Sequence, residues 1–179
     1  MDDTVTGARV DLTVTVDLAP ERLWDLVSDV TRIGEWSPEC VGACWSADGP
    51  PGPRAGARFE GHNRYPDGGT AAVACVVTES VRPEVFARVC LDDSGDEARP
   101  ASIWRYELAP ADEPGRTVVR HGFVHGPGRS GARAGAQADP ASLTRRLSAL
   151  HGSMAATVAA MVAAAARGTD VRPTTEENR

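Results

Sequence analysis

The sequence APERLWDLVSDVTRIGEWSPEC, residues 19–40, decides the fold of this chain. Pro20 stands at a position typical of a helix start, and five apolar residues then recur at helical spacing. They are Leu23, Trp24, Leu26, Val27 and Val30. The spacing predicts a helix that breaks near residues 28–29, followed by a second short helix that ends at Gly34. The chain then turns through Trp36 and Pro38 into a strand-like segment.

Strand-like segments lie on both sides of this stretch. Strict alternation of apolar and polar residues predicts a half-buried strand over residues 8–18. Short turn-forming segments such as PDGG (66–69) separate six further strand-like segments, which favours antiparallel neighbours. The six are Glu39–Ser46, Ala57–Tyr65, Thr70–Val81, Val85–Asp92, Ser102–Leu108 and Thr117–His125.

A long helix closes the predicted order of elements. Asp139 is a capping residue, Pro140 opens the helix, and Gly168 ends it after about Arg167. Its apolar stripe consists of Leu143, Leu147, Leu150, Met154, Val158, Met161 and Ala165. This helix is expected to begin only after residues 126–139, in which GPGRSG (126–131) is expected to be a flexible loop at the rim of the cavity.

These elements predict an α+β fold. A seven-stranded antiparallel sheet must bury one apolar face, and one long C-terminal helix is available to cover it, with two short helices after the first strand. We therefore expect the sheet to curl around the helix and to leave a hydrophobic cavity between them. Residues 1–7 are expected to be a tail, residues 8–168 a single ligand-binding domain, and residues 169–179 a flexible tail.

Composition limits the possible partners. The net charge is -6, the chain has no lysine, and its arginines are scattered. These features argue against nucleic acid or an anionic membrane as the main partner. The longest apolar run, residues 154–166, is shorter than the roughly 20 residues that span a bilayer. Without an apolar leader at its start, the chain is expected in the cytoplasm, as a monomer or a homodimer.

Strand alternation identifies candidate catalytic residues on the inner face of the sheet. Asn63 shares a face with Phe59, Tyr106 with Trp104, and His121 with Phe123. Imidazole titrates near neutral pH and a phenol donates to a developing enolate, so His121 and Tyr106 are candidates for acid–base catalysis, with Asn63 as a third polar group. The alternative is that all three are hydrogen-bonded core residues. The candidate ligand-binding residues are Phe59, Trp104, Phe123, His151, Met154, Val158 and Met161.

Several familiar motifs fail on spacing. GPGRSG (126–131) matches G-x-G-x-x-G, but the next helix is expected to begin about eight residues too late, and no further strand follows to complete a βαβ unit. His121 and His125 lie about 13 Å apart on a strand, which is too far for one metal ion. Cys40 and Cys44 are equally far apart, and the four cysteines are expected to be buried thiols. We therefore expect no metal and no cofactor.

The segments APERLWDLVSDVTRIGEWSPEC (19–40), GARFEGHNR (56–64) and WRYEL (104–108) resemble the SRPBCC superfamily, which includes START and birch-pollen-allergen-like proteins. The resemblance is strongest to the branch described as polyketide cyclase/dehydrase and lipid transport, and covers residues 8–167. It implies the helix-grip fold, and it implies that Trp36 lies near the mouth of the cavity as a ligand-binding wall. The alternative for Trp36 is a plug between sheet and helix. No catalytic motif spans the superfamily, so no catalytic role is carried over.

Two functions follow as hypotheses. The first is a cofactor-independent polyketide cyclase or dehydratase that acts on a hydrophobic natural-product intermediate. The second is a non-catalytic carrier of a lipid or an aromatic metabolite, and a regulatory protein that uses the same cavity is a weaker third. Polar groups deep in the cavity would favour catalysis, whereas polar groups only at its mouth would favour transport.

Overall fold

The computed structural model describes residues 4–65 and 68–169, and the side chains of the last helix as far as Arg167. The elements are β1 (Arg9–Val16), α1 (Pro20–Ser28), the 3-10 helix η1 (Val30–Glu35), β2 (Cys40–Trp45), β3 (Arg58–Arg64), β4 (Thr70–Val81), β5 (Val85–Cys90), β6 (Ser102–Pro110), β7 (Thr117–His125), α2 (Gly131–Ala138) and α3 (Ala141–Thr169). The predicted order of strands and helices is confirmed, except for the additional helix α2.

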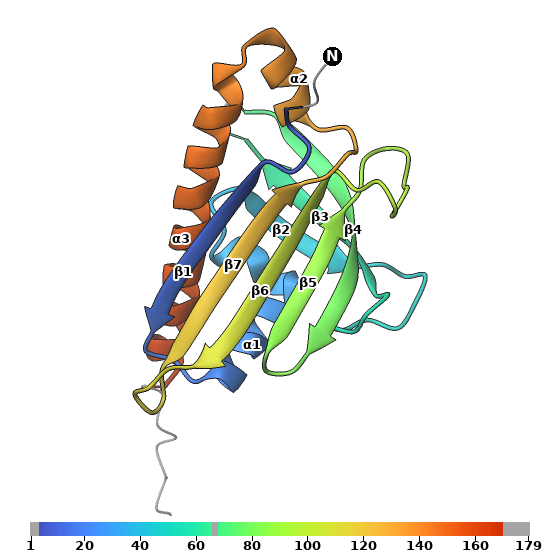
Figure 1. Ribbon diagram of the computed structural model, residues 1–179. Coiled ribbons are helices and arrows are strands. Elements are labelled where there is room, and N and C mark those ends of the chain that lie inside the picture. The colour runs from blue at the N-terminus through green and yellow to red at the C-terminus, as the bar shows by residue number, and fades with distance from the viewer. Residues whose placement is uncertain (1–3, 66–67, 170–179) are drawn as a thin grey trace, which may run out of the picture.

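The strands form one antiparallel sheet in the order β1-β7-β6-β5-β4-β3-β2. The sheet curls, with α3 alongside β1 at one edge and α1 behind β5 and β6 (Figure 1). We call the face that α1 and α3 cover the inner face. The fold is therefore the helix-grip arrangement that the sequence predicts.

The main hydrophobic core lies between the inner face and the two helices. Its largest fully buried side chains include Phe86 on β5, Leu23 on α1, and Met154 and Met161 on α3. The helix α3 contributes the predicted stripe from Leu150 onward, because residues three and four apart lie on one side of a helix. Within the described residues, α3 is also the one helix long and apolar enough to cross a membrane, and its apolar stripe packs on the sheet.

A β-bulge in β2 decides which of its residues face inward. Cys40 is opposite Asn63, but the register shifts between Cys40 and Gly42. A bulge adds one residue on its strand, so Cys40 and Trp45 lie on the same face although they are five positions apart. Trp45 packs edge-on against Phe59, with ring centroids 5.6 Å apart. The bulge also explains why apolar residues occur at both odd and even positions of this segment: inward-facing positions are even-numbered before the bulge and odd-numbered after it.

The segment after β7 differs from the predicted flexible loop. Residues 131–138 form helix α2, whose N-cap Ser130 accepts a hydrogen bond from the Arg133 backbone N–H. The Arg133 guanidinium donates to the carbonyl oxygens of Gly126 and Gly128. A helix does begin at the end of GPGRSG, so that reason for rejecting a dinucleotide site was wrong. The second reason holds for the described part of the chain, in which no strand follows β7 and every strand pair is antiparallel.

An ion pair joins the two ends of the curl. The Arg146 guanidinium on α3 donates two hydrogen bonds of 2.6 Å to the Glu39 carboxylate, which directly precedes β2. The two side chains are only 32% and 18% exposed.

The two predicted tails differ in how much of each the structure describes. Residues 5–7 are attached to the fold, since Val5 is buried and Gly7 N–H donates to the carbonyl of His125. Most of the predicted C-terminal tail, residues 170–179, lies outside the described residues.

Candidate functional site

The inner face divides into a covered part and an open part. Beneath α1 and α3, Phe86, Tyr106 and His121 are almost completely buried. From β2 to β6, away from these helices, several side chains are only half-buried although they face the inside of the curl. The half-buried residues of this open part include Cys40, Ala43, Asn63, Val73, Arg88, Cys90 and Trp104. The open part is the more exposed portion of the inner face, and it borders the covered part at Trp104, whose ring centroid lies 5.7 Å from that of His121.

Tyr106 and His121 form the deepest polar group on this face. They are opposite each other on β6 and β7, and their rings stack with centroids 3.7 Å apart. Both residues are 3% exposed. Among the described residues, neither ring nitrogen of His121 has a hydrogen-bond partner. A buried polar group normally has a partner, so His121 has hydrogen-bonding capacity that the protein does not use.

Burial fixes the protonation state of both rings at neutral pH. It lowers the pKa of His121 well below its usual value, and the nearby positive charge of Arg88 lowers this pKa further. Burial also raises the pKa of Tyr106 to about 12, against an opposing effect of Arg88. At neutral pH, His121 is therefore expected to be a neutral imidazole and Tyr106 a neutral phenol.

Arg88 is the functional candidate that the sequence analysis missed. It lies on β5 opposite Trp104, on the same face as Phe86 and Cys90, and its guanidinium lies 5.3 Å from the centre of a Trp104 ring. Within the described part of the chain, no carboxylate forms an ion pair with it. The signal is present in the sequence, because strand alternation from Phe86 places Arg88 on the inner face.

The remaining predicted residues of the sheet line the same face. Phe59 is buried, Trp104 is half-buried, and Phe123 packs edge-on against Trp104 at 4.8 Å. Asn63 faces inward as predicted, is half-buried, and donates to the Tyr65 hydroxyl at 3.4 Å. Asn63 belongs to the open part near β2, so the structure does not group it with Tyr106 and His121.

The predicted residues on α3 differ in their positions. Met154, Val158 and Met161 are buried in the main core, where they pack against the sheet. His151 is exposed, which corrects the expectation that it lies beside the inner stripe. The reason is that His151 follows Leu150 by one residue, about 100° around the helix, and so lies on the outer side. Ligand contact by the three buried residues stays a prediction.

Trp36 is buried in the main core, at 5% exposure, with the Arg32 guanidinium 4.7 Å from the centre of its ring. This position fits the role of a plug between sheet and helix. Its indole N–H has no acceptor among the described residues, so it is available to donate a hydrogen bond to a ligand. Gly34 fixes the approach of this turn to β2, because a Cβ there would lie 2.3 Å from the carbonyl oxygen of Val41.

Other predictions from single residues need correction. Cys44 is exposed on the outer face of β2 and is not a buried thiol. Glu39 is mostly buried against Arg146, although an acidic side chain in a turn is usually solvated. Arg145 is exposed and pairs with Asp139. No group of three or more metal-binding side chains occurs within the residues that the structure describes.

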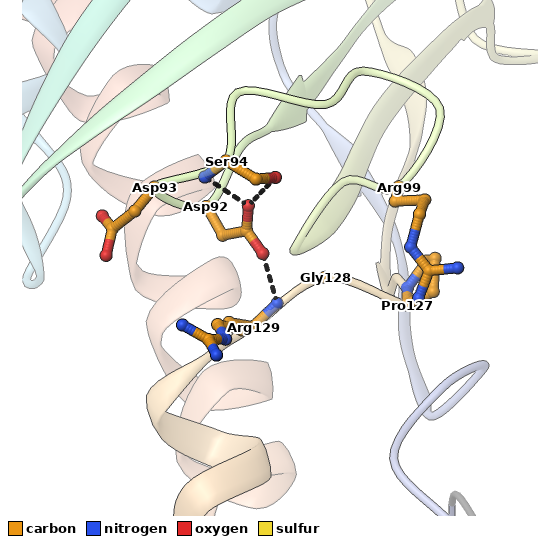
Figure 2. Close-up of a pocket in the computed structure, with 7 residues that line it drawn as sticks. All are labelled: Asp92, Asp93, Ser94, Arg99, Pro127, Gly128 and Arg129. Carbon is orange, nitrogen blue, oxygen red and sulfur yellow. Dashed lines mark hydrogen bonds between the residues drawn. The ribbon is translucent and has the colours of Figure 1, made fainter.

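Two pockets lie elsewhere on the molecule. One, of about 460 Å³, lies between the β5–β6 loop and the segment that leads into α2 (Figure 2). There Asp92 accepts hydrogen bonds from Ser94 and from the backbone N–H of Arg129, which lowers the pKa of Asp92 to about 2. The other, of about 300 Å³, lies on the outer face around Arg105 and Arg120. Neither is the predicted cavity between sheet and helix, which therefore stays a prediction.

Comparisons with known proteins support the helix-grip fold and identify a family. The sequence pattern of the family described as polyketide cyclase / dehydrase and lipid transport matches residues 7–167. No curated protein matches the chain. Among solved structures, a Nitrosomonas europaea protein has 12% identity and a TM-score of 0.65, with 94% of this chain and 99% of that chain covered. A polyketide-cyclase-like protein of Corynebacterium glutamicum has 24% identity and a TM-score of 0.58, with 96% and 97% covered. Identities this low support the fold alone.

Proposed function

Because the chain belongs to the polyketide cyclase/dehydrase and lipid transport family, we propose that it binds a hydrophobic small molecule on the inner face of its sheet and catalyses a cofactor-independent cyclisation or dehydration. The observation that carries this proposal is the buried, stacked pair of Tyr106 and His121, in which neither imidazole nitrogen has a hydrogen-bond partner among the residues that the structure describes.

The ligand would be an aromatic or polyketide-like molecule. The inner face holds six of the nine aromatic side chains of a chain that is otherwise poor in them. They are Trp45, Phe59, Phe86, Trp104, Tyr106 and Phe123. Apolar and aromatic walls with a few convergent polar groups are typical of small-molecule sites.

The proposed reaction uses the protonation states that burial sets. Neutral His121 accepts a proton from a methylene group between two ketones. Such a methylene group needs a base to lose its proton, and it is acidic enough for an imidazole to serve as that base. The enolate oxygen receives hydrogen bonds from the Tyr106 hydroxyl and the Arg88 guanidinium. The enolate carbon then attacks a second carbonyl of the same chain. The new C–C bond closes a ring, and loss of water follows.

Transport of the same ligand is the alternative function. A carrier needs apolar walls and has no use for polar groups deep in its binding site. The depth of Tyr106 and His121 therefore supports catalysis over transport.

Turnover and binding can be separated experimentally. We would incubate the protein with linear poly-β-ketone thioesters and detect cyclised products by mass spectrometry, while N-phenylnaphthylamine, a neutral fluorescent probe, reports binding. Tyr106→Phe and His121→Gln are each expected to lower turnover by roughly 10²–10⁴-fold with probe affinity retained.

His62→Gln is the matched control, because His62 is exposed on the outer face of β3, and its turnover should equal that of the wild type. Unchanged turnover in both inner-face variants would reject the catalytic assignment. Probe binding without turnover of any thioester would identify the protein as a carrier.

A further inference from the structure

Two thiols meet on the inner face, next to Arg88. Cys75 on β4 and Cys90 on β5 are opposite each other, and their sulfur atoms are 3.4 Å apart. The neighbouring pair, Ala74 and Leu91, is hydrogen-bonded, since Leu91 N–H donates to the Ala74 carbonyl at 2.8 Å. Hydrogen-bonded and non-hydrogen-bonded pairs alternate along an antiparallel ladder, so Cys75 and Cys90 form a non-hydrogen-bonded pair.

This position permits a disulfide. Residues of a non-hydrogen-bonded pair have Cα atoms about 4.5 Å apart, within the roughly 4.4–6.8 Å range of disulfides. The two thiols can therefore join without a shift of either strand. Cys40 and Cys44 lack this relation, because they lie on one strand and face opposite sides of the sheet.

The surroundings of Cys90 favour its thiolate. The Cys75 thiol donates a hydrogen bond to the Cys90 sulfur, and Arg88 and Ser102 interact with the same sulfur. These contacts lower the pKa of Cys90 below that of an ordinary thiol, first through the hydrogen bond from Cys75 and then through the charge of Arg88. The Cys75 thiol, as the buried donor of the pair, has a raised pKa. Of the two sulfurs, Cys90 is therefore the one expected to be the nucleophile, with Cys75 as the protonated thiol.

We propose that Cys75 and Cys90 form an oxidation site that a hydroperoxide converts into a cross-strand disulfide. The Cys90 thiolate attacks one oxygen of hydrogen peroxide, the O–O bond breaks, hydroxide leaves, and Cys90 becomes a sulfenic acid. Cys75 then attacks the Cys90 sulfur, the S–S bond forms, and the S–O bond breaks. The released hydroxyl group leaves as water with the Cys75 proton. The two sulfur atoms supply the two electrons that reduce the peroxide.

A small oxidant can reach this site from the open part of the inner face. Cys90 is half-buried there, beside the half-buried Arg88 and Trp104. The reaction requires no ligand in the proposed cyclase site, so its test is independent of the proposed function.

The test treats the full chain with hydrogen peroxide in the Cys44→Ser background, because Cys44 is exposed and could join two molecules. Intact mass spectrometry should show the loss of two hydrogen atoms, and peptide mapping should find residues 75 and 90 linked. In Cys75→Ser the reaction should stop at a Cys90 sulfenic acid, which dimedone traps. In Arg88→Met, oxidation at about pH 5 should slow by up to about tenfold, as expected if the Cys90 pKa rises by about one unit, because well below its pKa the thiolate fraction falls in proportion.

A Cys75–Cys90 peptide that stays reduced, under peroxide that oxidises Cys44 in the wild type, would overturn the proposal. A disulfide that joins Cys90 to Cys40 would overturn it as well. The wild-type peptide map decides the question even if Cys75→Ser fails to fold.

Discussion

At the scale of single residues, the site depends on polar side chains that the fold buries without full compensation. Neutral His121 and protonated Tyr106 owe their states to burial, and Arg88 contributes a positive charge that no described carboxylate balances by an ion pair. Each of these features has a measurable consequence.

The first consequence is a dependence of stability on pH. His121 is neutral in the folded chain but takes up a proton below about pH 6.5 once unfolded. The unfolded state then binds more protons, so stability is lost as pH falls, by up to about 1.4 kcal/mol per pH unit from this residue. Urea unfolding followed by tryptophan fluorescence should show a smaller loss between about pH 7.5 and 5.5 in His121→Gln than in the wild type. Equal slopes in the two proteins would contradict the buried neutral imidazole.

The second consequence is a preference for anionic ligands. Anilinonaphthalene sulfonate and N-phenylnaphthylamine share one ring skeleton and differ in a sulfonate group. Because hydrogen bonds to charged groups contribute about 1.5–3 kcal/mol, Arg88→Met should weaken sulfonate binding by roughly 10–100-fold. Binding of the neutral probe should change little. Equal losses for both probes in fluorescence titrations would show that Arg88 acts through packing and not through its charge.

At the scale of elements, η1 and β2 approach each other so closely that only glycine fits at position 34. Gly34→Ala should lower the free energy of unfolding by about 1–3 kcal/mol, because its Cβ would overlap the Val41 carbonyl. Gly42→Ala is the matched control on the facing strand, since a Cβ there meets nothing within 4 Å. Chemical unfolding of both variants measures the difference. Similar stabilities for the two variants would mean that the turn at Gly34 can move away from β2 with little loss of stability.

At the scale of the whole molecule, the ion pair between Arg146 and Glu39 holds α3 to the start of β2 across the open side of the curl. Arg146→Gln should cost about 1–3 kcal/mol, because it leaves the mostly buried Glu39 carboxylate without its partner. Arg145→Gln, one residue earlier, breaks an exposed pair with Asp139 and should cost less than about 0.5 kcal/mol. Thermal unfolding at low and high salt would compare them. A larger loss in Arg145→Gln would contradict the role of this ion pair.

Local patterns predicted most of the fold. Strand alternation identified the inward side of β3, β6 and β7, and helical spacing identified the buried stripe of α3. Helical spacing did not predict α2, because a segment rich in alanine and glycine has no stripe of large apolar residues. That helix depends on its Ser130 cap and on contacts of Arg133 with residues 126 and 128. The roles of Asn63, Tyr106 and His121 in catalysis remain predictions.

The sequence by itself determined the kind and order of the elements and the face on which most side chains lie, because these follow from periods of 2.0 and 3.6 residues within a short segment. Only the tertiary structure decided which side chains meet across strands. Strand register brings Tyr106 to His121 and Cys75 to Cys90, and the bulge in β2 turns Cys40 inward. Register and bulges depend on contacts between segments far apart in the chain, which no local pattern records.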